Sequence, residues 1–170
     1  GGVGKTTAAI FVYNLNHHIF ERSCFLANIR ETCNQLNGLL NLQTQLLSRI
    51  LKGQIEKIYN DYEGTTKIED ALGSNRVFIV LDDVDDVNQL DVLIGTQDLY
   101  PGSKIIITTR NKWLLKARKI HTLHEVEILD DDESLELFSW YAFGQDHPLE
   151  GYSHTAVRVV QRCGGLPLAL

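Results

Sequence analysis

Apolar residues along this chain follow two patterns, short continuous runs and longer stripes at helical spacing. Residues 77–81 and 105–107 are continuous runs bounded by polar residues, a pattern typical of strands buried on both faces of a parallel sheet. Leucines and isoleucines between residues 39 and 51 form a helical stripe that ends near Gly53. Strands and helices that alternate in this way predict a three-layer α/β domain.

Weaker signals extend this prediction to the rest of the chain. Residues 24–29 are interpreted as a strand, residues 54–64 as polar and turn-rich, residues 66–72 as a short helix, and residues 125–129 as an alternating edge strand. From Asp130 onward only helices are indicated, one ending at Gly144, one at Gly164, and one beginning at 166–168. We therefore expect an α/β unit over residues 1–129 and the beginning of a helical unit over residues 130–170.

The chain begins with Gly-Gly-Val-Gly-Lys-Thr-Thr, the later part of the phosphate-binding pattern G-x-x-x-x-G-K-[ST]. Gly2 and Gly4 allow backbone conformations that turn successive N–H groups, including that of Val3, toward a phosphate. Lys5 supplies a positive charge for the β- and γ-phosphates, and the Thr6 hydroxyl suits Mg²⁺.

The segment from Thr7 onward is expected to be a helix, with Ala8, Val12, Leu15 and Ile19 on one face. Its N-terminal dipole would also favour an anion. The sequence thus predicts a nucleotide site that includes residues 2–7. Because the first glycine and the strand of this pattern lie before residue 1, we expect a fragment of a longer protein.

Two acids follow the buried run at residues 77–81. A carboxylate at the C-terminal end of a parallel strand lies at the edge where such sheets bind ligands. Asp82 is therefore expected to hold the Mg²⁺ that Thr6 also binds, directly or through water. Asp83, one residue on, is the candidate catalytic carboxylate that orients water or accepts a proton, although such a pair can also be a solvated strand end.

Arg110 follows the other buried run, after Thr108 and Thr109. Its guanidinium could bind the γ-phosphate through paired hydrogen bonds and so distinguish a triphosphate from a diphosphate. Arg110 can face the γ-phosphate only if residues 104–109 lie beside the strand that is expected before residue 1, with residues 77–81 on their other side. A surface arginine with no ligand is the alternative.

Composition excludes several other functions. The net charge of −6 argues against nucleic-acid binding as the main purpose, and no apolar run is long enough to span a membrane. Three cysteines, Cys24, Cys33 and Cys163, lack metal-ligand spacing and favour a reducing, cytoplasmic or nucleocytoplasmic location. His121 and His124 are expected to face opposite sides of a strand and make a poor metal pair.

The order of these motifs resembles the NB-ARC domain, the switch module of plant nucleotide-binding, leucine-rich-repeat disease-resistance proteins and a relative of apoptotic protease-activating factors. The resemblance covers the whole chain through successive motifs at residues 1–7, 25–31, 80–85, 102–110, 135–140 and 165–170. Asp85 resembles the subclass that carries an N-terminal Toll/interleukin-1 receptor (TIR) domain.

This resemblance implies a Mg²⁺-dependent ADP/ATP switch. With ADP bound the protein is closed and does not signal, and with ATP bound it opens, oligomerises and signals defence. Slow ATP hydrolysis would return it to the ADP-bound state. Pro167 would lie against the nucleotide from the helical unit. Implied partners are the TIR, winged-helix and leucine-rich-repeat domains of the same protein, and further copies of it when ATP is bound.

Two other classes remain open on the sequence. The loop also fits partitioning ATPases of the ParA or MinD type, although residues 82–85 lack the Asp-Thr-Pro-like segment typical of that class. A metabolic or motor ATPase with steady turnover is the second alternative, and a multiple-turnover rate would separate it from a switch.

Overall fold

In a computed structural model, residues 1–53, 57–117 and 122–170 are described, so His121 and residues 54–56 lie outside the described part. The chain forms two compact units, Thr6–Thr122 on the one hand and Gly1–Lys5 with Leu123–Leu170 on the other. The division at residues 129 and 130 into an α/β and a helical part remains a sequence prediction.

Three parallel strands form the sheet of the larger unit in the order β1 (Arg22–Leu26), β2 (Val77–Val84) and β3 (Lys104–Thr109). The central strand is buried on both faces, as its continuous apolar run predicts. The α/β class with a parallel sheet is therefore confirmed. The expected contact of β3 with β2 is also confirmed, and no described strand pairs with the other edge of β3.

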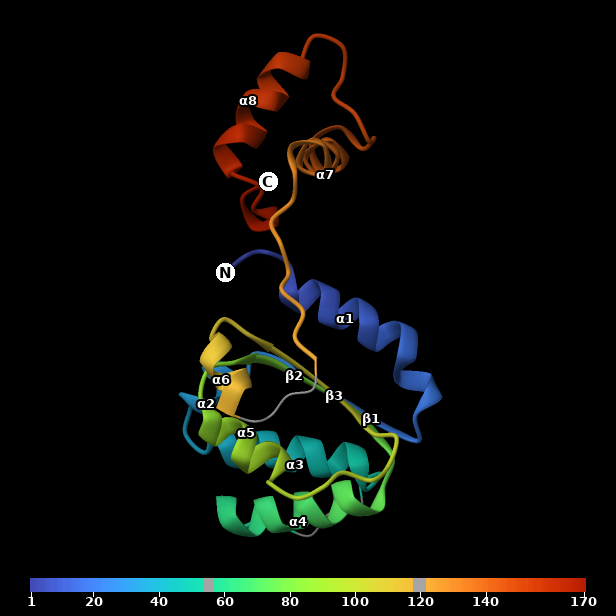
Figure 1. The fold of residues 1–170 in the computed structure, drawn as a ribbon, viewed down its shortest axis with the longest axis vertical. Coiled ribbons are helices and arrows are strands. Elements are labelled where there is room, and N and C mark those ends of the chain that lie inside the picture. Colours follow the sequence, from blue (N-terminus) through green and yellow to red (C-terminus); the bar gives the residue numbers. More distant parts are fainter. Residues whose placement is uncertain (54–56, 118–121) are drawn as a thin grey trace. The chain divides into compact units, whose positions relative to one another are not determined.

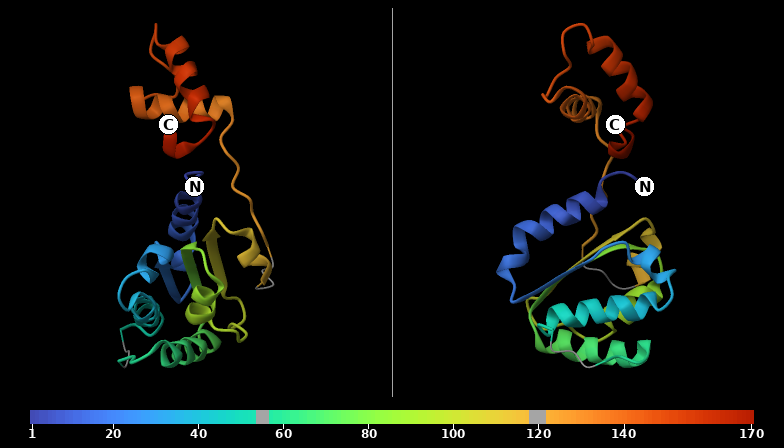
Figure 2. Two further views of the ribbon diagram at one scale, coloured as in Figure 1. Left: turned by 90° about the vertical axis from the view of Figure 1, so that its left-hand side faces the viewer. Right: turned by 180° about the vertical axis from the view of Figure 1, so that it is seen from behind.

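Helices cover both faces of this sheet, as Figures 1 and 2 show. One face carries α1, and α3, α4 and α5 lie on the opposite face. The larger core is on that second face, where the buried side chains of the helices meet Ile79 and Leu81. The helices of this unit are α1 (Lys5–Asn16), continued by the 3₁₀ turn η1 (His17–Ile19), then α2 (Ile29–Cys33), α3 (Gly38–Ile50), α4 (Asp61–Ser74), α5 (Val87–Ile94) and α6 (Lys112–Ala117).

The face by which α1 packs differs from the expected one. Ala9 is its buried residue and Tyr13 packs beside it against Phe78, whereas Leu15 and Val12 are exposed. The ring of Tyr13 stacks on Phe78 and meets the ring of Phe25 edge-on, two arrangements that aromatic pairs favour. Because α1 carries apolar residues on several sides, its spacing alone did not identify the buried side.

Three other elements differ from the sequence prediction. The strand expected at residues 24–29 is β1, which begins at Arg22 and ends at Leu26, and Ile29 already belongs to α2. The short helix expected at residues 66–72 is the 14-residue α4, which begins after Asn60 because that side chain accepts a hydrogen bond from the Glu63 N–H. The edge strand expected at residues 125–129 is absent, and Val126 and Ile128 are exposed. A β-strand forms by hydrogen bonding to a neighbouring strand, and within the described residues no strand pairs with residues 125–129.

The smaller unit contains α7 (Asp131–Phe143), α8 (Ser153–Cys163) and the 3₁₀ turn η2 (Pro167–Ala169). Asp130 forms a capping box with Glu133, and Gly144 and Gly164 end the two helices in the left-handed conformation. These helix starts and stops confirm the sequence prediction, except that the segment after residue 166 is a single 3₁₀ turn.

All three cysteines are free thiols. Burial raises the pKa of the Cys24 thiol to about 11, and burial, followed by the negative charge of Asp85, also raises the pKa of Cys33. Both side chains therefore remain protonated at neutral pH and act as small apolar groups.

Gly38, the first residue of α3, is expected to be intolerant of any side chain. A Cβ there would overlap the Thr32 carbonyl oxygen, and a backbone atom cannot rotate away. We expect Gly38→Ala to lower the free energy of unfolding by about 1–3 kcal/mol, as overpacking does. Urea titration of the purified chain measures this.

Gly73 is the matched control, since it lies within α4 and a Cβ there would meet nothing within 4 Å. Gly73→Ala should be neutral or stabilise by up to about 1 kcal/mol, because alanine has a higher helix propensity than glycine. Equal stabilities of the two variants would contradict this account of Gly38.

Candidate functional site

The glycine-rich loop leads directly into α1. Gly2 and Gly4 have φ angles of 85° and 91°, values that the missing side chain permits. Lys5 begins α1, and Thr6 and Thr7 lie in its first turn. The first N–H groups of a helix lack partners within it, so this end of α1 can donate hydrogen bonds to an anion.

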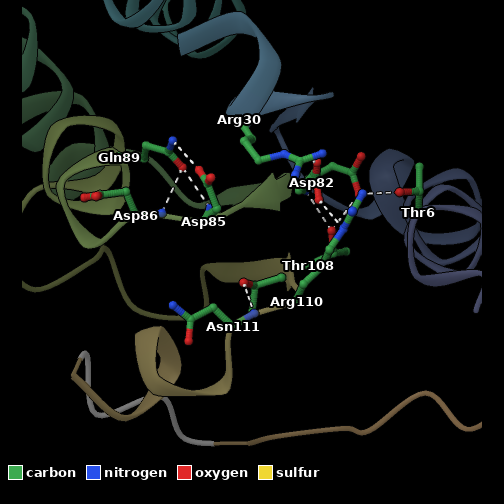
Figure 3. Close-up of polar contacts among 11 residues, drawn as sticks. Thr6, Arg30, Asp82, Asp85, Asp86, Gln89, Thr108, Arg110 and Asn111 are labelled. Atoms are coloured by element: carbon green, nitrogen blue, oxygen red, sulfur yellow. Dashed lines mark hydrogen bonds and ion pairs between the residues drawn. The ribbon is translucent and has the colours of Figure 1, made fainter. Parts of the chain in front are cut away.

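Asp82 links the start of α1 to the sheet. Its side chain is fully buried, and its Oδ1 accepts hydrogen bonds from the hydroxyls of Thr6, at 2.8 Å, and Thr108, at 2.6 Å (Figure 3). Parallel pairing explains this meeting, because the carboxyl ends of β2 and β3 lie at the same edge of the sheet. The expected proximity of Thr6 and Asp82 is thus observed.

The second carboxylate oxygen of Asp82 is buried and has no hydrogen-bond partner among the described residues. Such an atom calls for a cation or water, because a buried polar atom without a partner is costly. No group of three or more His, Cys, Asp or Glu side chains in the described ranges could hold a metal ion. Mg²⁺ needs few protein ligands when phosphates and water complete its shell, so the oxygens of Asp82 and Thr6 fit this ion.

Asp83 has a different environment from that of Asp82. It has a φ angle of 54°, and its N–H donates to the Thr108 hydroxyl oxygen at 2.9 Å, next to an irregularity in the β2–β3 register. Its carboxylate pairs with two arginines, Oδ2 with Arg30 Nε at 3.0 Å and Oδ1 with Arg110 Nε at 3.2 Å. The two acids therefore face different partners although they are adjacent in sequence.

Sequence reasoning placed Arg110 at this edge but did not assign it to Asp83. It also gave no role to Arg30 or to Thr108, whose hydroxyl connects both acids. Thr108 lies in the motif at residues 102–110, which the sequence did indicate. The contact of Arg30 depends on the pairing of β1 with β2, which sequence spacing does not reveal.

Asp85 and Asp86 have structural roles after β2. Asp86 caps α5 by accepting from the Asn88 N–H at 2.7 Å. Asp85 accepts from the Gln89 side chain at 2.8 Å (Figure 3). These contacts fix the segment that follows the two candidate acids.

In the smaller unit, the segment around Pro167 lies against the first residues of the loop. The Leu168 N–H donates to the Gly2 carbonyl oxygen at 3.2 Å, and a Cβ on Gly2 would lie 3.0 Å from the Leu168 Cβ. Pro167 begins the turn η2 beside this contact. A contact of Pro167 with nucleotide remains a prediction.

The chain matches a known protein family over most of its length. The family model described as "NB-ARC domain" matches residues 1–147. The chain belongs to the NB-ARC family.

Curated relatives of this NB-ARC chain are disease-resistance proteins. It is 49% identical over 172 residues to Disease resistance protein RUN1 of Vitis rotundifolia, covering all of this chain and 13% of the relative. It is 38% identical over 178 residues to TMV resistance protein N of Nicotiana glutinosa, covering all of this chain and 15% of that protein. Probable disease resistance protein RPP1 of Arabidopsis thaliana is 37% identical over 175 residues, which are 99% of this chain and 14% of the relative.

The NB-ARC chain therefore spans less than a fifth of the length of these relatives. Within the described residues, no helix is long and apolar enough to cross a membrane.

Proposed function

We propose that this NB-ARC chain is the Mg²⁺-dependent ADP/ATP-binding switch of a plant immune receptor of the TIR subclass. The observation that carries the proposal is the buried Asp82 carboxylate, which accepts from Thr6 and Thr108 and keeps one oxygen without a partner. A buried acid with an unused oxygen beside the first turn of a phosphate-binding helix suits a metal–phosphate ligand.

Each residue has a distinct role in this proposal. The N–H groups of residues 2–7 donate to phosphate oxygens, and Lys5 neutralises the β- and γ-phosphates. Thr6 and Asp82 hold Mg²⁺, which when bound neutralises charge on the phosphate oxygens. Arg110 senses the γ-phosphate, and Pro167 contacts the nucleotide from the segment that lies against Gly2.

Asp83 is the proposed catalytic carboxylate, and its contacts account for slow hydrolysis. Two arginines pair with it, one at each carboxylate oxygen, and they compete with a water molecule for these oxygens. Efficient general-base catalysis would require at least one of these arginines to move away.

Other features of the proposal concern the longer protein. Its TIR, winged-helix and leucine-rich-repeat domains would be the partners, and ATP-bound copies would associate to signal defence. The free thiols suit a cytoplasmic or nucleocytoplasmic location.

Turnover kinetics test whether this site serves a switch. In the protein that carries this chain, we expect ATP hydrolysis far below about 1 s⁻¹, as in switch NTPases without an activating partner protein. Radiolabelled ATP under single- and multiple-turnover conditions measures this rate. Steady turnover at tens per second would contradict a switch and favour an ordinary ATPase.

A further inference from the structure

Asp83 is shared by two arginines that come from different neighbours of β2. Arg30 lies in α2, which follows β1, whereas Arg110 directly follows β3. Figure 3 shows the two side chains approaching the end of β2 from opposite sides, close to the labelled Thr6 and Asp82. Each arginine bonds a separate oxygen of the carboxylate, so neither displaces the other.

The carboxylate is held in this position by the backbone. Asp83 adopts a left-handed conformation, uncommon for a residue with a side chain, and its N–H is bound to Thr108. Its side chain is 20% exposed, against 42% for Arg30 and 53% for Arg110. The acid is thus the fixed partner, and Arg110 is the more exposed and more easily displaced arginine.

Under the proposed function, Arg110 has two competing anionic partners, Asp83 and the terminal phosphate of ATP. Moving Arg110 to the phosphate removes one cation from a carboxylate that is largely shielded from water, which is unfavourable. Arg30 reduces the cost of this transfer because it still pairs with Oδ2 of Asp83. Its positive charge also repels Arg110 and weakens the Arg110–Asp83 pair.

We propose that Arg30 is a positioning residue that retains Asp83 and so allows Arg110 to transfer to the terminal phosphate of a nucleoside triphosphate. Arg30 would thereby set the preference for ATP over ADP without binding either nucleotide. This inference rests on the proposed function, since it requires Arg110 to sense the terminal phosphate.

The test is the ratio of dissociation constants for a non-hydrolysable ATP analogue and ADP, measured with Mg²⁺ by calorimetry on the protein that carries this chain. Arg30→Gln should lower the preference for the ATP analogue by about two- to fivefold, the scale of a partly exposed ion pair. The affinity for ADP should stay within about twofold on the same scale. Arg30→Lys, which keeps a cation near Asp83, should retain most of the wild-type ratio.

A double-mutant cycle separates this role from direct attraction between Arg30 and the phosphates. In the Asp83→Asn background Arg110 is no longer held by a charged partner, so adding Arg30→Gln should leave the ratio unchanged. If Arg30 instead attracts the phosphates directly, Arg30→Gln would still lower the ratio in the Asp83→Asn background. That result would overturn the proposal. Arg49→Gln is the matched control, because it removes one positive charge from the same unit beside Cys24.

Arg110→Gln distinguishes a failure of this inference from a failure of the proposed function. If Arg110→Gln leaves the ratio unchanged, the assignment of Arg110 is wrong and the role of Arg30 is overturned with it. If Arg110→Gln lowers the ratio and Arg30→Gln does not, only the role of Arg30 is overturned. Loss of ADP binding in both Arg30 variants would indicate a structural residue and would also overturn the proposal.

Discussion

Lys5→Ala is expected to abolish nucleotide retention and signalling in a protein that contains this chain. Lys5 is the one lysine or arginine of the loop at residues 1–7, and it begins α1, whose first N–H groups are the proposed donors to the same phosphates. Hydrogen bonds to charged groups contribute about 1.5–3 kcal/mol each, so affinity for ADP should fall by roughly 10- to 100-fold. Nucleotide extracted from the purified variant and quantified by chromatography measures the loss.

Lys104→Ala is the matched control for this substitution. Lys104 is an exposed lysine at the start of β3, at the opposite end of the strand from Thr109 and Arg110. The control should retain nucleotide as the wild type does. Normal occupancy in Lys5→Ala would refute the assignment of the phosphate-binding loop.

Substitutions of Asp82 and of Asp83 are expected to have different effects on nucleotide binding and on hydrolysis. Asp82→Ala removes the proposed metal ligand and the acceptor of Thr6 and Thr108, so Mg²⁺-dependent binding should weaken by about 10- to 100-fold. Asp83→Ala should leave binding nearly intact and slow hydrolysis by about 10²- to 10⁴-fold, the range for general-base catalysis. In a switch, the Asp83→Ala variant would accumulate bound ATP and so favour the active state.

Asp82→Asn serves as the control for folding, because an amide oxygen can still accept from both threonine hydroxyls but lacks the negative charge that favours Mg²⁺. It should be as stable as the wild type and still lose the dependence on Mg²⁺. Equal losses of binding in the Asp82 and Asp83 variants would contradict the division of roles.

Local chemistry allowed much of the fold to be predicted from sequence. The run of β2 is buried on both sides, so its apolar character is continuous, and the α7 start is marked by a complete capping box. The run at residues 105–107 in β3 was also correctly assigned to a strand, but its side chains are only half-buried because β3 is at the edge of the described sheet. The glycine-rich loop and the two acids near the end of β2 could also be found, because each motif is a run of neighbouring residues in the sequence.

Features that depend on tertiary neighbours could not be predicted in this way. The buried side of α1 is decided by Tyr13 packing on Phe78, and residues 125–129 lack the paired strand that their alternation suggested. Arg30 meets Asp83 only because β1 pairs with β2. Spacing along the chain carries no information about these contacts.

The central claim is that this NB-ARC chain binds nucleotide through Mg²⁺ at Thr6 and Asp82. Calorimetric titration of the wild-type protein with ADP, with and without Mg²⁺, tests it most directly. We predict saturable binding of one ADP per chain that becomes at least about tenfold tighter with Mg²⁺, the lower end of the effect of a metal ligand. Absence of saturable binding, or an affinity that Mg²⁺ does not change, would contradict the claim.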